Sequence, residues 1–151
     1  MCSRKSKLAI FINVIVFLSV AVVAGCVAKA KGPNFQMEEN VPSNKALVYF
    51  YRPYKGLGAA LSDMAIADNG NIICTNILMN GYCVSIAEPG NYKFHTVSPI
   101  IDKVKEVVIK PGDKLYFKVI HQCGVWACSH TLYTVDENLA IEELASFKLQ
   151  Y

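Results

Sequence analysis

The residues best suited to chemistry lie in the segment His121-Gln122-Cys123-Gly124-Val125-Trp126-Ala127-Cys128-Ser129-His130. The segment has a histidine at each end, and a cysteine lies two residues inward from each histidine. If the segment forms a hairpin with a four-residue loop, Cys123 faces Cys128 and His121 faces His130, and all four side chains fall on one face. This arrangement allows two chemistries. The cysteines can form a disulfide, or the four side chains can bind zinc or, with reduced thiols, copper.

Cys74 and Cys83 are the second candidate disulfide pair. If Asn80-Gly81 is a two-residue turn, position 83 faces position 78, and Cys74 lies too far along the strand to reach Cys83. A bridge then requires a wider loop or a corner between two sheets. Four cysteines allow three pairings, and the sequence leaves the choice among them open.

Catalytic arrangements are not evident in the sequence. All three histidines lie in strand-like segments, without a serine elbow or a nearby carboxylate pattern: His95, His121 and His130. Thiol oxidoreductases usually have two residues between their cysteines, whereas four residues separate Cys123 from Cys128. Glu142 and Glu143 are adjacent on a predicted helix and point about 100° apart, which favours a solvated face. We therefore expect no enzyme activity.

Two loops are candidates for binding a partner. One is Gly56-Leu57-Gly58, and the other is the tip of the predicted hairpin, where Trp126 can serve as an exposed recognition aromatic or fold back onto the sheet. An open strand edge is a third possibility.

The first 26 residues indicate where the protein works. Arg4, Lys5 and Lys7 precede an apolar run from Leu8 to Val23, and small residues then lead to Cys26. This is the composition of a secretory signal. The alternative is an uncleaved membrane helix, but the run is shorter than the roughly 20 apolar residues that usually span a bilayer.

The residues Val23-Ala24-Gly25-Cys26 resemble the lipobox of bacterial lipoproteins. The resemblance implies that residues 1–25 are removed and that Cys26 carries a covalent lipid, the only added group that we expect. Val27 follows the cysteine in place of aspartate, which in a Gram-negative host implies the outer membrane, facing the periplasm. In this oxidising compartment thiolates tend to pair, so disulfides are favoured over a metal site. Four ligands on a flat hairpin face also converge poorly on a tetrahedron.

Removal of the signal also changes the net charge. Arg4, Lys5 and Lys7 account for the formal charge of +3, and the 12 basic residues that remain balance the 12 acidic ones. A neutral mature chain argues against nucleic acid as a partner. Residues 26–45 contain Gly32, Pro33 and Pro42 and are predicted to be a flexible tether that holds the domain on the order of 25 Å from the membrane.

Residues 46–151 are predicted to form one domain. Seven or eight short runs of β-branched and aromatic residues alternate with turn dipeptides such as Asn69-Gly70 and Pro111-Gly112. This pattern predicts an all-β fold, an antiparallel β-sandwich or small barrel. The predicted strands are Ala46 to Arg52, Asp63 to Asp68, Asn71 to Ile77, Tyr82 to Ala87, Tyr92 to Val97, Lys103 to Lys110 and Lys114 to His121.

The end of the chain changes to a helical period. Thr134 and Glu137 are spaced as a capping box, and apolar residues then recur at intervals of three and four up to Phe147. We expect a short C-terminal helix that packs over one edge of the sheet.

Several strand ends and turns resemble the bacterial domain-of-unknown-function 2846 family. They are Val48 to Pro53, Asp68-Asn69-Gly70, Asn80-Gly81-Tyr82, Pro89-Gly90 and Pro111 to Tyr116, and the resemblance covers about Lys45 to the C-terminus. It implies a β-sandwich, often on a lipoprotein, with no established activity. The cysteines are not part of the family pattern.

The sequence therefore predicts a non-enzymatic lipoprotein of the cell envelope. Its membrane contact is the lipid anchor, and its partner is another envelope protein or component. The alternative is a metal-binding or thiol-redox module at the His121, Cys123, Cys128 and His130 hairpin.

Overall fold

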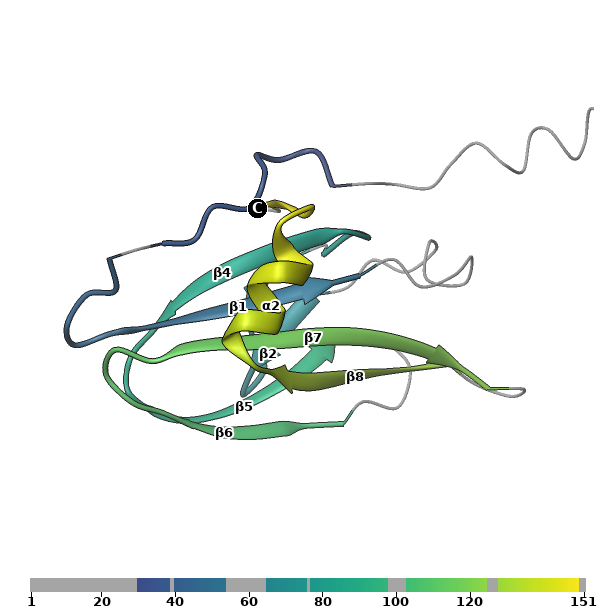
Figure 1. Ribbon diagram of the computed structural model, residues 1–151. Coiled ribbons are helices and arrows are strands. Elements are labelled where there is room, and N and C mark those ends of the chain that lie inside the picture. Colours follow the sequence, from purple (N-terminus) through teal and green to yellow (C-terminus); the bar gives the residue numbers. More distant parts are fainter. Residues whose placement is uncertain are drawn as a thin grey trace, which may run out of the picture.

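A computed structural model describes residues 30–38, 40–53, 65–75, 77–97, 103–124 and 128–149. These residues form a β-sandwich of two sheets with one short helix (Figure 1). The elements are β1 (Ala46–Arg52), β2 (Ala65–Asp68), β3 (Asn71–Cys74), β4 (Gly81–Ala87), β5 (Gly90–Val97), β6 (Lys105–Ile109), β7 (Lys114–Cys123), β8 (Cys128–Val135), α2 (Glu137–Leu144) and β9 (Lys148–Leu149). The all-β sandwich and the C-terminal helix agree with the sequence prediction.

The two sheets differ in size. The five-stranded sheet has the order β8-β7-β1-β4-β9, and the four-stranded sheet has the order β3-β2-β5-β6. Most neighbours are antiparallel, but β1 runs parallel to β7, and β4 runs parallel to β9. The predicted β-sandwich is confirmed, but the expectation of antiparallel pairing does not hold for these two strand pairs of the five-stranded sheet. Between β1 and β7 the chain forms β2, β3, β4, β5 and β6, so these two parallel neighbours are not the strands of a hairpin.

β1 lies at the centre of the five-stranded sheet and is buried on both faces. Its sequence, ALVYFYR, is a nearly continuous apolar run, which is the composition of a doubly covered strand. Alternate residues serve different layers. Val48 and Phe50 point into the space between the sheets, whereas Tyr49 and Tyr51 belong to a second cluster beneath α2.

Aromatic rings occupy the middle of the core between the sheets. The ring centroid of Phe50 lies 5.1 Å from that of Phe94 and 5.4 Å from that of Phe117. Phe94 and Phe117 are in turn 5.4 Å apart. These residues come from β1, β5 and β7, so the cluster joins the two sheets.

The helix begins later than the sequence predicts. β8 continues through Val135, and Thr134 pairs with Phe117 in the ladder, so Thr134 does not cap the helix. The N-cap is Asp136, whose carboxylate accepts the backbone N–H of Asn138 at 3.0 Å. The predicted capping box is wrong because the strand extends two residues further than the local pattern suggests.

α2 covers a face of the five-stranded sheet and not an edge, which corrects the second prediction about the helix (Figure 1). Ala140, Leu144 and Phe147 pack against the tyrosines on the outer side of β1, β4 and β7. The edge beside β4 is instead occupied by β9.

Part of the predicted tether packs on the domain. Asn34 forms a bridge with Lys148, and the N–H of Phe35 donates to the carbonyl of Phe147 at 2.9 Å. The Phe35 ring lies 5.2 Å from Tyr82 and 6.0 Å from Tyr49, between centroids. The prediction of a flexible tether is wrong for this segment, because Phe35 attaches it to the cluster beneath α2.

Candidate functional site

The backbone of the predicted hairpin has the expected register. His121 is the ladder partner of His130, and Cys123 is the partner of Cys128. The side chains of Cys123 and Cys128 lie outside the described part of the structure, as do Trp126 and the Gly56-Leu57-Gly58 loop. The structure therefore places the two histidines in full and the two cysteines by backbone only.

The two imidazole rings are in direct contact. Nδ1 of His121 and Nε2 of His130 are 2.7 Å apart, and the ring centroids are 4.7 Å apart. One nitrogen must donate and the other accept, because two protonated nitrogens would repel each other. His130 is 1% exposed, and its Nδ1 has no hydrogen-bond partner in the described residues.

The surroundings of this pair disfavour a positive charge. Burial lowers the pKa of His130 to about 4, with smaller contributions from His121 and Arg52. Burial also lowers the pKa of His121, again assisted by Arg52. Arg52 ends β1, is itself 1% exposed and donates through Nη1 to the carbonyl of Ile77 at 3.3 Å. Both imidazoles are therefore neutral at pH 7.

Neutral imidazole is the form that binds metals, but the structure supplies only part of the predicted ligand set. Among the described residues, no group of three or more histidine, cysteine or acidic side chains is placed to hold an ion. The positive charge of Arg52 also disfavours a cation nearby. In the described residues, the histidine pair is thus a buried polar contact between β7 and β8.

The burial of His130 is expected to make the stability of the protein sensitive to acid. The unfolded chain binds protons on its histidines below about pH 6.5, whereas folded His130 does so only near pH 4. We expect the free energy of unfolding to fall by roughly 1 to 3 kcal/mol from this source as the pH decreases through that window. Urea unfolding at pH 7 and pH 4.5 measures the change.

The matched variants are His130→Gln and His95→Gln. His130→Gln should lose much of the pH dependence between these two values. His95 lies on β5 in the other sheet and is partly exposed, so His95→Gln should keep the wild-type dependence. Equal pH dependence in wild type and His130→Gln would contradict the assignment.

Cys74 and Cys83 form a disulfide that joins the two sheets. Their Cα atoms are 6.1 Å apart, with Cys74 at the end of β3 and Cys83 in β4. β3 is shorter than predicted, and the chain after it crosses to the other sheet instead of forming a two-residue hairpin. The bridge therefore forms at a corner between the two sheets, which is one of the two arrangements that the sequence spacing allows. With Cys74 and Cys83 paired, Cys123 and Cys128 are the remaining candidate pair.

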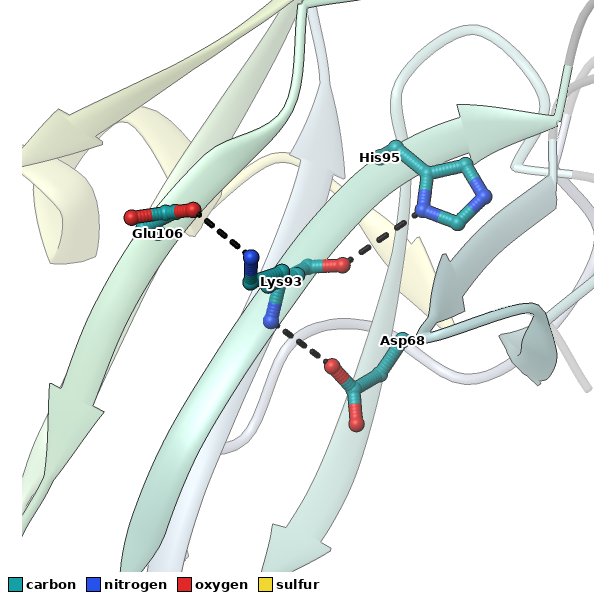
Figure 2. Close-up of polar contacts among 4 residues, drawn as sticks. All are labelled: Asp68, Lys93, His95 and Glu106. Atoms are coloured by element: carbon teal, nitrogen blue, oxygen red, sulfur yellow. Dashed lines mark hydrogen bonds and ion pairs between the residues drawn. The ribbon is translucent and has the colours of Figure 1, made fainter.

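The outer face of the four-stranded sheet was not anticipated from the sequence. Figure 2 shows its polar contacts: Asp68 Oδ1 accepts the N–H of Lys93 at 2.8 Å, and Lys93 Nζ lies 3.0 Å from a carboxylate oxygen of Glu106. His95 Nδ1 is 3.4 Å from the carbonyl oxygen of Lys93. Exposed aliphatic residues surround these contacts, namely Ile72, Val97, Val104 and Val108.

We call this surface, made of Ile72, Lys93, His95, Val97, Val104, Glu106 and Val108, the open face. It includes a shallow hollow of about 400 Å³ beside Lys93, Glu106 and Val108. Alternation in the sequence identifies such strands as half-buried, but it does not show whether a helix covers the other half. The helix covers the opposite sheet, which leaves this face exposed.

The acidic residues of the helix have structural partners. Glu143 accepts the hydroxyl of Tyr51 at 2.6 Å and the ammonium of Lys118 at 2.5 Å, while Glu142 is exposed. The prediction of a solvated face therefore holds for Glu142 and is wrong for Glu143. Burial and the contact with Glu143 raise the pKa of the Tyr51 hydroxyl, so it stays protonated as a donor. This network fastens α2 to β1 and β7.

Two observations concern the remaining predictions. Cys26 lies outside the described residues, and in the part of the chain that is described no helix is long and apolar enough to cross a membrane. No protein-family model matches this chain, and no curated protein matches it. The resemblance to the domain-of-unknown-function 2846 family thus stays a prediction from its turns and strand ends.

Proposed function

We propose that the protein is a non-enzymatic, lipid-anchored β-sandwich of the cell envelope that binds another envelope protein through the open face. The observation that carries the proposal is the unequal covering of the two sheets. α2 and the segment around Phe35 cover the outside of the five-stranded sheet, whereas four large aliphatic side chains are exposed on and beside the other sheet.

The composition of the open face favours a protein as the partner. Val108 is 64% exposed and lies two residues from Glu106 on β6, beside the ion pair between Lys93 and Glu106, and Ile72 on β3 is 58% exposed. Exposed apolar residues rimmed by polar ones are typical of protein interfaces. Because the two charges balance each other, this surface has no strong attraction for a polyanion or a polycation.

The reactive side chains of the described residues support a binding role. Cys74 and Cys83 are used in a disulfide, Glu143 is used in holding α2, and His130 is enclosed against His121. Each of these groups has a structural contact that explains its position.

The anchor and the compartment are inferred from the N-terminal sequence. A lipid on Cys26 would place the domain at a membrane, and the absence of aspartate at position 27 favours the outer membrane of a Gram-negative cell. The disulfide between Cys74 and Cys83 is consistent with export, because such bonds persist in oxidising compartments.

Crosslinking in intact membranes followed by affinity purification tests the proposal. We expect a specific envelope protein with the wild-type chain, and its loss with Val108→Asp on the open face. The matched control is Ile86→Asp, because Ile86 is 63% exposed but belongs to β4 of the other sheet. Recovery of only the background seen with an unrelated lipoprotein would contradict the proposal.

The contact between His121 and His130 favours a second candidate, a metal-binding or thiol-redox module that includes Cys123 and Cys128. Native mass spectrometry of residues 27–151 made in an oxidising compartment separates the two candidates. Two disulfides and no ion would exclude the metal site, whereas an ion that a chelator removes would support it.

A further inference from the structure

The edge strands of the two sheets differ in how they are protected. Within the described residues, the sheets end at β3, β6, β8 and β9. β3 has four residues and β9 has two, so neither offers a long row of free backbone groups. β9 is also bridged through Lys148 to Asn34. β6 carries Lys105 and Glu106, charges that discourage strand addition.

β8 lacks each of these protections. It has eight residues, CSHTLYTV, with no proline and no aspartate, glutamate, lysine or arginine. One side pairs with β7 over the whole strand, from Cys128 to Val135. The other side has no partner strand in the described part of the chain. Its free N–H and C=O groups form a template for another strand.

Apolar side chains lie beside this edge. Tyr133 is 43% exposed and Leu139 is 48% exposed. Both line a shallow groove of about 420 Å³ along the outer side of β7 and β8, next to the start of α2. A strand added to β8 lies next to Tyr133, so it removes apolar surface from water in addition to pairing the free backbone groups.

We propose that β8 is a self-association edge, which pairs antiparallel with β8 of a second copy and joins the two five-stranded sheets into one. A second copy fits this edge because β8 carries no charged side chain, so identical strands do not repel each other. The mature chain is also formally neutral. Antiparallel pairing of identical strands has the twofold symmetry that a closed dimer requires.

The pairing has a definite geometry. Thr131 and Leu132 lie at the middle of β8, and a twofold axis at Thr131 places Ser129 of each copy opposite Tyr133 of the other. Each copy then gains the same backbone hydrogen bonds and the same cover for Tyr133. This interface is separate from the open face, so a dimer keeps both open faces available.

Analytical ultracentrifugation of the full chain, solubilised in a mild detergent, tests the proposal by measuring the molar mass of the protein. We expect a dimer for the wild type and a monomer for Thr131→Lys, which brings two like charges together at the axis. Val108→Lys, on β6, is the matched control and should remain a dimer. A monomeric wild type at the highest soluble concentration, or a dimeric Thr131→Lys, would overturn the proposal.

A cysteine scan keeps the test decisive if Thr131→Lys does not fold. Ser129→Cys, Thr131→Cys and Tyr133→Cys are oxidised separately in membranes and examined on non-reducing gels. We expect crosslinked dimer at the position nearest the twofold axis and less at the others, with none from Val108→Cys above the wild-type level. Crosslinking that does not exceed wild type at any of the three positions would contradict β8 pairing.

Discussion

Replacing Cys74 and Cys83 together by alanine is expected to lower the free energy of unfolding by about 3 kcal/mol. The bridge closes a short loop, with a sequence separation of 9, and so removes conformational freedom from the unfolded chain. It also connects two strands that belong to different sheets and share no ladder. Both cysteines are buried, so the variant also loses packing contacts in the core between the sheets.

Chemical unfolding of residues 27–151 in guanidinium chloride measures this effect. The control is the variant with Cys123→Ala and Cys128→Ala, whose closed loop is shorter and whose loss we expect to be about 2 kcal/mol at most. In the variant with Cys123→Ala and Cys128→Ala, the bridge between Cys74 and Cys83 is the one disulfide available. Reducing that variant should therefore lower its free energy of unfolding by about 3 kcal/mol. An unchanged unfolding midpoint after reduction would show that this bridge contributes little.

Local features of the fold could be predicted from the sequence because they depend on near neighbours. Asn69 and Gly70 both adopt positive φ, as the turn between β2 and β3 requires, and Gly112 does the same between β6 and β7. The register that pairs His121 with His130 follows from the symmetry of one hairpin. In each of these cases a few adjacent residues determine the geometry.

The remaining features depend on residues far apart in the chain. The parallel pairing of β1 with β7 brings the end of β1 close to His121, and Arg52 thereby helps to lower the pKa of both histidines. The periodicity of the sequence does not indicate that Arg52 lies near the two histidines. The position of α2 is equally nonlocal, and it decides which sheet face is covered and whether Glu143 meets water or Tyr51.

The docked N-terminal segment changes what the predicted lipid anchor implies. Ala30 is 8% exposed, and Phe35 is fixed against Tyr49 and Tyr82. Cys26 and Ala30 are four residue-to-residue steps apart, each of at most about 3.5 Å, so a lipid on Cys26 would lie within about 14 Å of the folded domain. The domain would then sit close to the membrane, without the longer reach that the sequence composition predicts.

Replacing Cys26 by alanine is therefore expected to move the protein completely from the membrane fraction to the soluble fraction. Each buried methylene of an acyl chain contributes about 0.8 kcal/mol to membrane binding, and a diacylglycerol supplies two chains at once. In the described residues, no helix could replace that contribution by crossing the bilayer. Metabolic labelling with a fatty acid, combined with fractionation after an alkaline wash, measures both the modification and the anchoring.

The matched control is Cys2→Ala, because Cys2 lies before the apolar run and should leave labelling and fractionation unchanged. The result separates two kinds of anchor. If the Cys26→Ala chain loses its label and its membrane association together, the lipid is the anchor. If the wild type itself takes up no label and stays in the washed membranes, the segment from Leu8 to Val23 holds the protein there as an uncleaved helix. The lipoprotein hypothesis would then be wrong, because the anchor would not depend on Cys26.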